Sequence, residues 1–278
     1  MAESGRVQEV GSRSILYIFM TIIGIAFLLP LIWMVVSSLK PEADVLSVPP
    51  SFWPHNPQWS NYSQVFDIIP RYFYNSVKLA VFNVVGVMAV AALAGYAFAR
   101  LDFAGRNALF TCLLSTAIVP GIIYLIPQYI IYSKIGWLDT HYPLWVPRVL
   151  TPVFPTFLMR QTFMTLPQAL EDAARIDGAN TFGIFLRVML PQTKPALAAI
   201  GMFTFLESWN DLFGPIIFIS SPRLETLPVA LAQFQGEYFS QVSLLMAAAT
   251  VTVLPVLALY LLTQRYFIQG ITMTGLRG

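Results

Sequence analysis

Six long apolar stretches restrict what this chain can fold into. A helix that crosses a bilayer needs about 20 predominantly apolar residues, and each stretch is long enough. They cover residues 15–37, 75–99, 107–133, 143–163, 196–219 and 242–264, to within a few residues. Only 11% of the residues are charged, against about 25% in a soluble domain. We therefore predict an all-α integral membrane protein, with residues 1–278 forming one domain of six transmembrane helices.

Two of these stretches need comment. The first follows Arg6 and Arg13, but it is too long for the core of a signal peptide and no small-residue cleavage site follows it. We expect it to be retained as the first span. The fourth holds Arg148 and four prolines, which a membrane helix tolerates where its neighbours satisfy the freed backbone groups. In the third, Pro120 and Pro127 favour ordinary kinks, with a gating role as the alternative.

The basic residues predict an orientation. Of the 16 Lys and Arg residues, ten fall on the side that holds both termini and six on the other. Because cytoplasmic loops carry the excess of Lys and Arg, both termini are predicted to be cytoplasmic. The net charge of +2 gives no basic surface for nucleic acid. A single cysteine, Cys112, and two isolated histidines argue against a disulfide and against a metal site.

The outer loop, residues 39–74, holds six prolines and several aromatic residues. Prolines preclude a long regular helix there, and aromatic side chains suit the interface between lipid and water. We expect a cap on the helix bundle at that interface.

The segment 165–194 is predicted to hold two short amphipathic helices on the cytoplasmic side. Thr165 and Gln168 have the spacing of a capping box, and Gly178 is expected to end the first helix because glycine accepts a left-handed backbone. Its polar side carries Glu171, Asp172 and Arg175. Asn180 is expected to cap the second helix, and Pro191 to end it.

This pair of helices has two interpretations. An amphipathic helix can lie on lipid headgroups, but anionic lipid would repel the carboxylates of Glu171, Asp172 and Asp177. The same segment carries the small residues Ala173, Ala174 and Gly178. Small residues suit close docking into a groove of another protein.

The same segment resembles the EAA loop of permeases from bacterial ABC importers. The family pattern is Glu-Ala-Ala, three residues, Gly, nine residues, Ile, any residue, and Leu-Pro. This chain keeps every spacing, with Asp172 in place of Glu and Val188 in place of Ile, and it ends the pattern at Leu190 and Pro191. Further likeness runs along nearly the whole chain, including Arg160 to Phe163, Ala174 to Ala179 and Trp209-Asn210. These elements are similar to the second permease of maltose-type carbohydrate importers.

The resemblance implies an assembly. Such a permease works beside a second, usually different permease, two cytoplasmic ATPase copies and an extracytoplasmic solute-binding protein, in the bacterial inner membrane. The EAA loop would form a coupling helix that sits in a cleft of the ATPase. The residues implied in this contact are Glu171, Asp172, Ala173, Ala174, Asp177, Gly178, Leu190 and Pro191.

The chain itself carries no G-x-x-x-x-G-K-[ST] loop and no Gly-Lys pair. Such a loop is what cradles the phosphates of ATP. We therefore expect no cofactor on this chain and no enzymatic activity, with ATP and Mg bound by the partner ATPase.

Ionisable residues inside apolar stretches are the candidates for a substrate path, because a charge in a bilayer is costly unless paired or hydrated. Glu207 and Asp211 lie four residues apart and are expected to share one helix face. Trp209 and Asn210 add a flat ring and an amide, which suit sugar hydroxyls and sugar faces. The alternative is a structural ion pair from Arg148 to Glu207 or Asp211. Lys78 is expected to reach the outer interface.

The sequence leaves other functions open. An importer of the same class could carry glycerol phosphate or a polyol, and a phosphate would favour a fixed cation such as Arg148. A channel or ion-driven carrier would need no ATPase, but such carriers often show internal repeats, and no clear repeat is present. A membrane scaffold would explain neither the loop nor the charges in the fifth stretch.

Overall fold

The computed structural model describes residues 2–237 and 241–275, with side chains for residue 13, 16–234 and 241–265. Helices connected by short loops make up these residues, and none of them lies in a β-strand. The chain divides into two compact units. The first comprises residues 1–69 and 231–253, and the second comprises residues 70–230 and 254–278.

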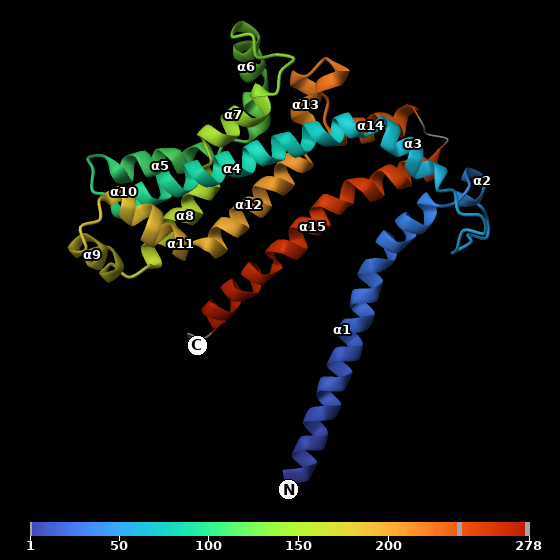
Figure 1. Ribbon diagram of the computed structural model, residues 1–278, viewed down its shortest axis with the longest axis horizontal. Coiled ribbons are helices and arrows are strands. Elements are labelled where there is room, and N and C mark those ends of the chain that lie inside the picture. Colours follow the sequence, from blue (N-terminus) through green and yellow to red (C-terminus); the bar gives the residue numbers. More distant parts are fainter. Residues whose placement is uncertain (1, 238–240, 276–278) are drawn as a thin grey trace. The chain divides into compact units, whose positions relative to one another are not determined.

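Three helices within the described residues are long and apolar enough to cross a membrane (Figure 1). They are Leu16–Ser38 of α1 (Ala2–Ser38), α4 (Pro70–Arg100), and Val242–Arg265 of α15 (Val242–Gly275). These helices correspond to the first, second and sixth apolar stretches. The protein is thus an all-α, multi-pass membrane protein, as the sequence predicts.

The third apolar stretch forms two helices instead of one. α5 (Arg106–Thr116) and α6 (Gly121–Lys134) meet at an angle of 94°, and Figure 1 shows α6 turning away from α5. Pro120 lies at the break and Pro127 lies inside α6. A proline lacks the backbone N–H that would continue a helix across the break, but its fixed φ angle suits a helix start.

The fourth and fifth stretches are also divided. α7 (Tyr142–Leu150) and α8 (Val153–Thr165) are separated by Thr151 and Pro152. α12 (Lys194–Trp209) ends before α13 (Phe213–Phe218) begins. None of these pieces is by itself long enough to pass as a membrane span. The count of six spans therefore stays a prediction.

The core of the second unit lies where α4 crosses α8. One face of α4 contributes Val87, Ala91 and Tyr96, and α8 contributes Met159 and Phe163. The two backbones approach closely at Gly95, since a Cβ atom placed there would lie 2.5 Å from the Cβ of Met159. Small residues allow such close helix packing in membranes.

The first unit contains residues 39–69 of the predicted outer loop. The helices in this part of the loop are short, as the prolines predict. They are α2 (Glu42–Val45) and α3 (Ser60–Ile68). The carboxylate of Glu42 accepts hydrogen bonds from the backbone N–H groups of Val242 and Ser243, at 2.6 and 2.9 Å. A carboxylate in this position satisfies the free N–H groups at the start of α15. α14 (Leu227–Glu237) and α15 have residues in both units.

Candidate functional site

The segment with the EAA spacing forms a small helical projection of the second unit. It contains α9 (Ala169–Ile176), α10 (Thr181–Ile184), a π-helical turn at Phe185–Met189 and α11 (Leu190–Gln192). In Figure 1 it follows α8 at the end of the unit opposite α6 and α13. The part after α9 packs into the core through Ile184, Phe185 and Met189.

The start of α9 differs from the prediction. Gln168 precedes the helix without a side-chain cap, and the hydroxyl of Thr165 donates instead to the carbonyl of Thr162, at 2.8 Å. The predicted capping box is wrong because Thr165 still belongs to α8, where its hydroxyl bonds the preceding turn.

The turn between the two short helices agrees with the prediction. Gly178 has φ of +82°, in the left-handed region, and the N–H of Ala179 donates to the carbonyl of Ala174, at 3.0 Å. These features close the end of α9 as expected for glycine after a helix. The side chain of Asn180 accepts a hydrogen bond from the N–H of Gly183, at 2.7 Å, and so caps α10.

The sequence predicts that Pro191 ends the second helix, but the helix continues past it. Pro191 lies in the first turn of α11, where a proline loses no helical hydrogen bond. The direction changes two residues later, at Thr193, whose hydroxyl donates to the carbonyl of Leu190. α12 then begins at Lys194.

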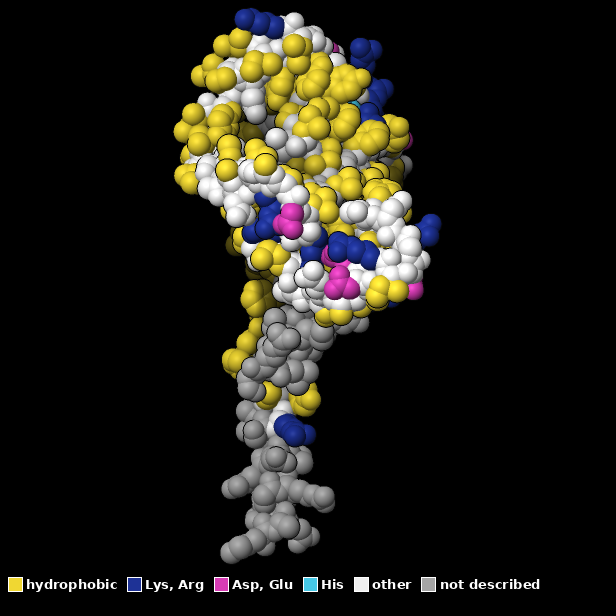
Figure 2. All heavy atoms as spheres, turned by 90° about the vertical axis from the view of Figure 1, so that its left-hand side faces the viewer, with side chains coloured by type: hydrophobic (Ala, Val, Ile, Leu, Met, Phe, Trp, Pro, Cys, Tyr) yellow, Lys and Arg dark blue, Asp and Glu magenta, His cyan; other side chains and the backbone are white. Residues whose placement is uncertain are grey.

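The outer side of α9 is open to solvent. Asp172, Ala173 and Asp177 are exposed, and the side chain of Ile176 is 87% exposed. Figure 2 looks at this end of the unit and shows acidic and basic side chains gathered beside hydrophobic ones. Ile176 was not among the predicted contact residues. Its apolar side chain between the charged residues Arg175 and Asp177 is the signal that could have indicated it.

Glu171 lies elsewhere than predicted. It was expected on the polar, solvent-facing side, but it is buried, and its carboxylate forms an ion pair with Nε of Arg100 at 3.3 Å. Arg175 approaches the same carboxylate at 3.6 Å. Arg100 is the last residue of α4. The sequence signal for it is a charge at the end of an apolar stretch, which requires a partner or water.

The residues predicted for a substrate path do not share one helix face. α12 ends at Trp209, so Asp211 lies beyond the helix that carries Glu207. The prediction that Glu207 and Asp211 share one helix face is therefore wrong, because it assumes that the helix continues through Asp211. Asp211 instead pairs with Arg148 at 3.4 Å and accepts a hydrogen bond from the N–H of Gly214, at 3.0 Å.

The neighbours of Asp211 have different environments. Glu207 and Asn210 are exposed, and the amide of Asn210 donates to the carbonyl of Leu206. Trp209 is only 1% exposed and packs against Phe73 and Phe205. Its ring therefore has no free face for a sugar, contrary to the role expected of it.

One polar residue near these groups was missed in the sequence. Asn83 of α4 is buried, and its amide donates to Oγ of Ser208 at 2.9 Å. An asparagine inside an apolar stretch is the signal that indicates such a buried hydrogen bond between helices. Among the residues whose structure is described, no group of three His, Cys, Asp or Glu side chains could hold a metal ion.

Comparison with known proteins identifies the family. Residues 1–273 match the binding-protein-dependent transport system inner membrane component family. This chain belongs to that family. It is 32% identical over 271 residues to the arabinooligosaccharides transport system permease protein AraQ of Bacillus subtilis (strain 168), covering 96% of both chains. It is 29% identical to the trehalose/maltose transport system permease protein MalG of Thermococcus litoralis, covering 98% of this chain and 99% of the relative.

A solved structure supports the fold. The chain matches one in the crystal structure of a bacterial ABC transporter involved in the import of the acidic polysaccharide alginate, with a TM-score of 0.77 and 24% identity. The match covers 91% of this permease and 95% of the other chain. The family match and the curated relatives, together with this fold, make the protein a permease subunit of an ABC importer.

The permease has a second polar cluster at the opposite end of the same unit. The carboxylate of Asp139 accepts hydrogen bonds from the N–H groups of Ser220 and Ser221, at 3.1 and 2.8 Å, and from the hydroxyl of Ser221. These donors favour the ionised form and lower the pKa of Asp139. Nearby, Nε2 of His141 hydrogen-bonds the carbonyl of Leu224, and burial lowers the pKa of His141.

Proposed function

We propose that this permease carries a sugar or short oligosaccharide into the cell, driven by an ATPase that docks on α9. The proposal rests on one observation above all. The residues with the EAA spacing form an exposed helix, with Asp172, Ala173 and Ile176 on its outer side. A projecting helix with an apolar tip and small residues suits insertion into a groove of a partner.

The partners follow from the family and from what this sequence lacks. The family is defined by its dependence on a binding protein, and the chain has no phosphate-binding loop of its own. We therefore propose two ATPase copies that bind ATP and Mg, a second and different permease, and an extracytoplasmic solute-binding protein. The proposed location is the bacterial inner membrane, with both termini cytoplasmic.

The proposed substrate is neutral and rich in hydroxyl groups. The relatives named for arabinooligosaccharides and for trehalose or maltose support a sugar. The ion pair between Arg148 and Asp211 also supports it, because Asp211 offsets the charge that a phosphate would need. We propose Glu207, Asn210 and the Arg148–Asp211 pair as the path residues of this chain, at the break between α12 and α13. α-Linked arabinotriose is the first substrate to test, with glycerol 3-phosphate as the contrasting probe.

The test of this function is recovery of the complex from its native membrane in a mild detergent. We expect the permease to co-purify with a second permease and two ATPase copies. Recovery of the chain alone, under conditions that preserve a known importer, would favour a carrier that needs no ATPase.

A substitution makes the test specific for α9. Replacing Ile176 by Asp places a charge at the centre of the proposed contact, and loss of a central contact residue typically costs about 2 kcal/mol or more, roughly thirtyfold in affinity. Ile176→Leu keeps the apolar surface and is the matched control. Equal ATPase recovery with Ile176→Asp and with Ile176→Leu would contradict docking at this face.

A further inference from the structure

α9 is attached to its unit through a buried acidic side chain, which is unusual for a helix that packs on an apolar core. Glu171 is the one residue of α9 that is buried, whereas Leu170 and Ile176 are exposed. A helix normally buries an apolar stripe. Here a carboxylate occupies the central buried position, so the contact depends on what it meets there.

Glu171 meets a guanidinium that also holds the end of another helix. Nη2 of Arg100 donates to the carbonyls of Phe163 and Leu166, at 2.6 and 2.5 Å, and its Nε donates to the carbonyl of Phe163, at 3.1 Å. Nε also lies 3.3 Å from the carboxylate of Glu171, with which it forms an ion pair. Phe163 and Leu166 belong to the last turn of α8 and the residue after it. The last carbonyls of a helix lack partners within the helix. Arg100 therefore joins the ends of α4 and α8 to α9.

Arginine is suited to this position. Its planar guanidinium presents five donors in a fixed arrangement, so one side chain can donate to two carbonyls while its charge attracts a carboxylate. The side chains of Arg100 and Glu171 are only 11% and 4% exposed. A buried ion pair of this kind is a poor source of stability, and its best-supported role is to specify one arrangement of elements.

We infer that Arg100 is a positioning residue, through which displacement of α9 is passed to α4 and α8. The inference rests on the proposed docking of the ATPase on α9. A partner that moves α9 pulls on Glu171, and the guanidinium passes this displacement to two of the helices that form the core of the unit.

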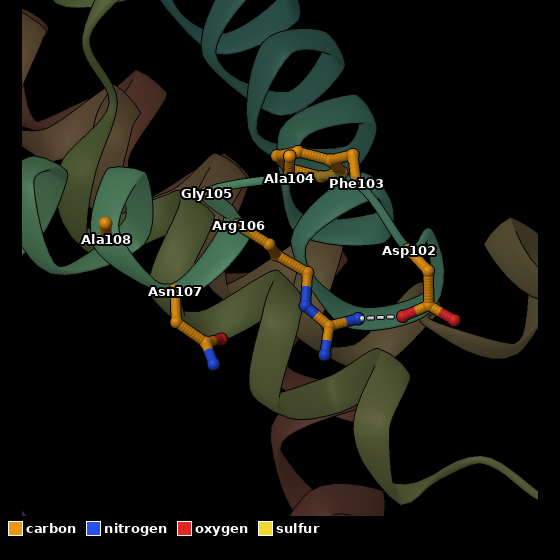
Figure 3. Close-up of a pocket in the computed structure, with 7 residues that line it drawn as sticks. All are labelled: Asp102, Phe103, Ala104, Gly105, Arg106, Asn107 and Ala108. Carbon is orange, nitrogen blue, oxygen red and sulfur yellow. Dashed lines mark hydrogen bonds and ion pairs between the residues drawn. The ribbon is translucent and has the colours of Figure 1, made fainter.

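The chain provides a matched control at the same end of α4. Arg106 pairs with Asp102 at 3.0 Å across the loop to α5, and the side chain of Asp102 is 97% exposed. Figure 3 shows the two side chains pointing toward each other beside an open hollow lined by residues 102–108. This pair links no other helix to α9, so its loss should leave transmission intact.

The experiment uses the complete complex in proteoliposomes. In a Cys112→Ser background, a cysteine in place of Thr151 reports on the break between α7 and α8. The measured quantity is the ratio of its maleimide labelling rates with and without MgATP and vanadate. We expect Arg100→Gln and Glu171→Gln to bring this ratio closer to one by roughly 2- to 30-fold, the range in which residues that carry coupling act. Arg100→Lys keeps the charge but loses the planar set of guanidinium donors, so its effect on the ratio should be intermediate. Arg106→Gln should leave the ratio unchanged.

The outcomes separate this inference from the proposed function. If the complex with Arg100 intact shows no nucleotide-dependent labelling, the ATP-driven function itself fails. If Arg100→Gln retains the full ratio, only the inference fails. A lower yield of complex with an unchanged ratio also overturns it, because Arg100 would then serve stability alone. Should Arg100→Gln not assemble, Arg100→Lys and Glu171→Gln decide by the same ratio.

Discussion

Asp139 shows how one residue can join two loops of this permease. Its φ angle of +55° is left-handed, a conformation that Asp and Asn tolerate better than most other side chains. In that conformation its N–H donates to the carbonyl of Phe218, at 2.8 Å, and its carboxylate accepts from Ser220 and Ser221. The loop before α7 is thereby fixed to the loop after α13. The backbone conformation of Asp139 and the charge of its side chain therefore both hold the two loops together.

The protonation of Asp139 gives a pH-dependent prediction. Its pKa in the folded protein lies below the ordinary value of 3.8, so its ionised form contributes stability above that value, and this contribution is lost as the pH falls through the lower, folded-state pKa. Asp139→Asn tolerates the same backbone but lacks the charge. We expect it to melt at a lower temperature than the original protein at pH 7 in detergent, and the difference to shrink as the pH falls below 3.8.

Asp67→Asn is the control for this measurement, since Asp67 is exposed on α3. A difference for Asp139→Asn that stays constant down to the lowest pH would mean that the carboxylate charge does not stabilise the contact.

The helices of the second unit combine broken apolar stretches with one very close crossing. The breaks after α5, α7 and α12 fall at short stretches that contain Pro120, Pro152 and Asp211. Irregular backbone at membrane depth is tolerated only where protein or water covers it. The pair of α4 and α8 contrasts with this, because both helices are continuous where Gly95 meets Met159. The second unit thus combines a closely packed pair of continuous helices with interrupted helices around the proposed path.

Gly95 gives a prediction for this helix pair. In Gly95→Ala the new Cβ atom would lie 2.5 Å from the Cβ of Met159 and 2.9 Å from the backbone N of Arg160, so α4 and α8 must move apart. Overpacking of this kind costs about 1–3 kcal/mol. We expect a lower unfolding midpoint in detergent.

The matching substitution is Gly24→Ala in α1, where a new Cβ atom meets nothing within 4 Å. Because alanine favours a helix over glycine, this variant should be neutral or slightly stabilised. Equal midpoints for Gly95→Ala and the original protein would show that the crossing can adjust.

On the scale of the whole molecule, the distribution of basic residues matters more than any single contact. The long helices α1, α4 and α15 are separated by segments whose Lys and Arg content predicts the sides of the membrane. On this basis we propose that the loop 39–74 faces outward and that α9 faces the cytoplasm. An even number of crossings is required for both termini to be on the cytoplasmic side.

Cysteine labelling tests this orientation directly. In a Cys112→Ser background, His55→Cys and Asp177→Cys place single thiols at exposed positions of the outer loop and of the α9 turn. A membrane-impermeant maleimide should label position 55 in intact cells, and position 177 only after permeabilisation. Labelling of position 177 in intact cells would reverse the proposed topology and remove α9 from the ATPase.

The sequence by itself determined those features of this protein that depend on local chemistry. Apolar length predicted the three long membrane helices, and the left-handed preference of glycine predicted the turn at Gly178. The amide of Asn180 predicted a helix cap, and the spacing from Asp172 to Pro191 predicted the family. Each of these depends on neighbours within a few turns of the chain, which a sequence displays directly.

Only the tertiary structure decided which partner each charged or aromatic side chain meets. Glu171 appeared to belong to a polar helix side, but Arg100, 71 positions earlier in the chain, draws it into the interior. Trp209 appeared free for a substrate, yet Phe73 covers it. The physical reason is that burial and ion pairing are set by contacts between distant segments. Helical spacing predicts such contacts only while a helix continues, and α12 ends before Asp211.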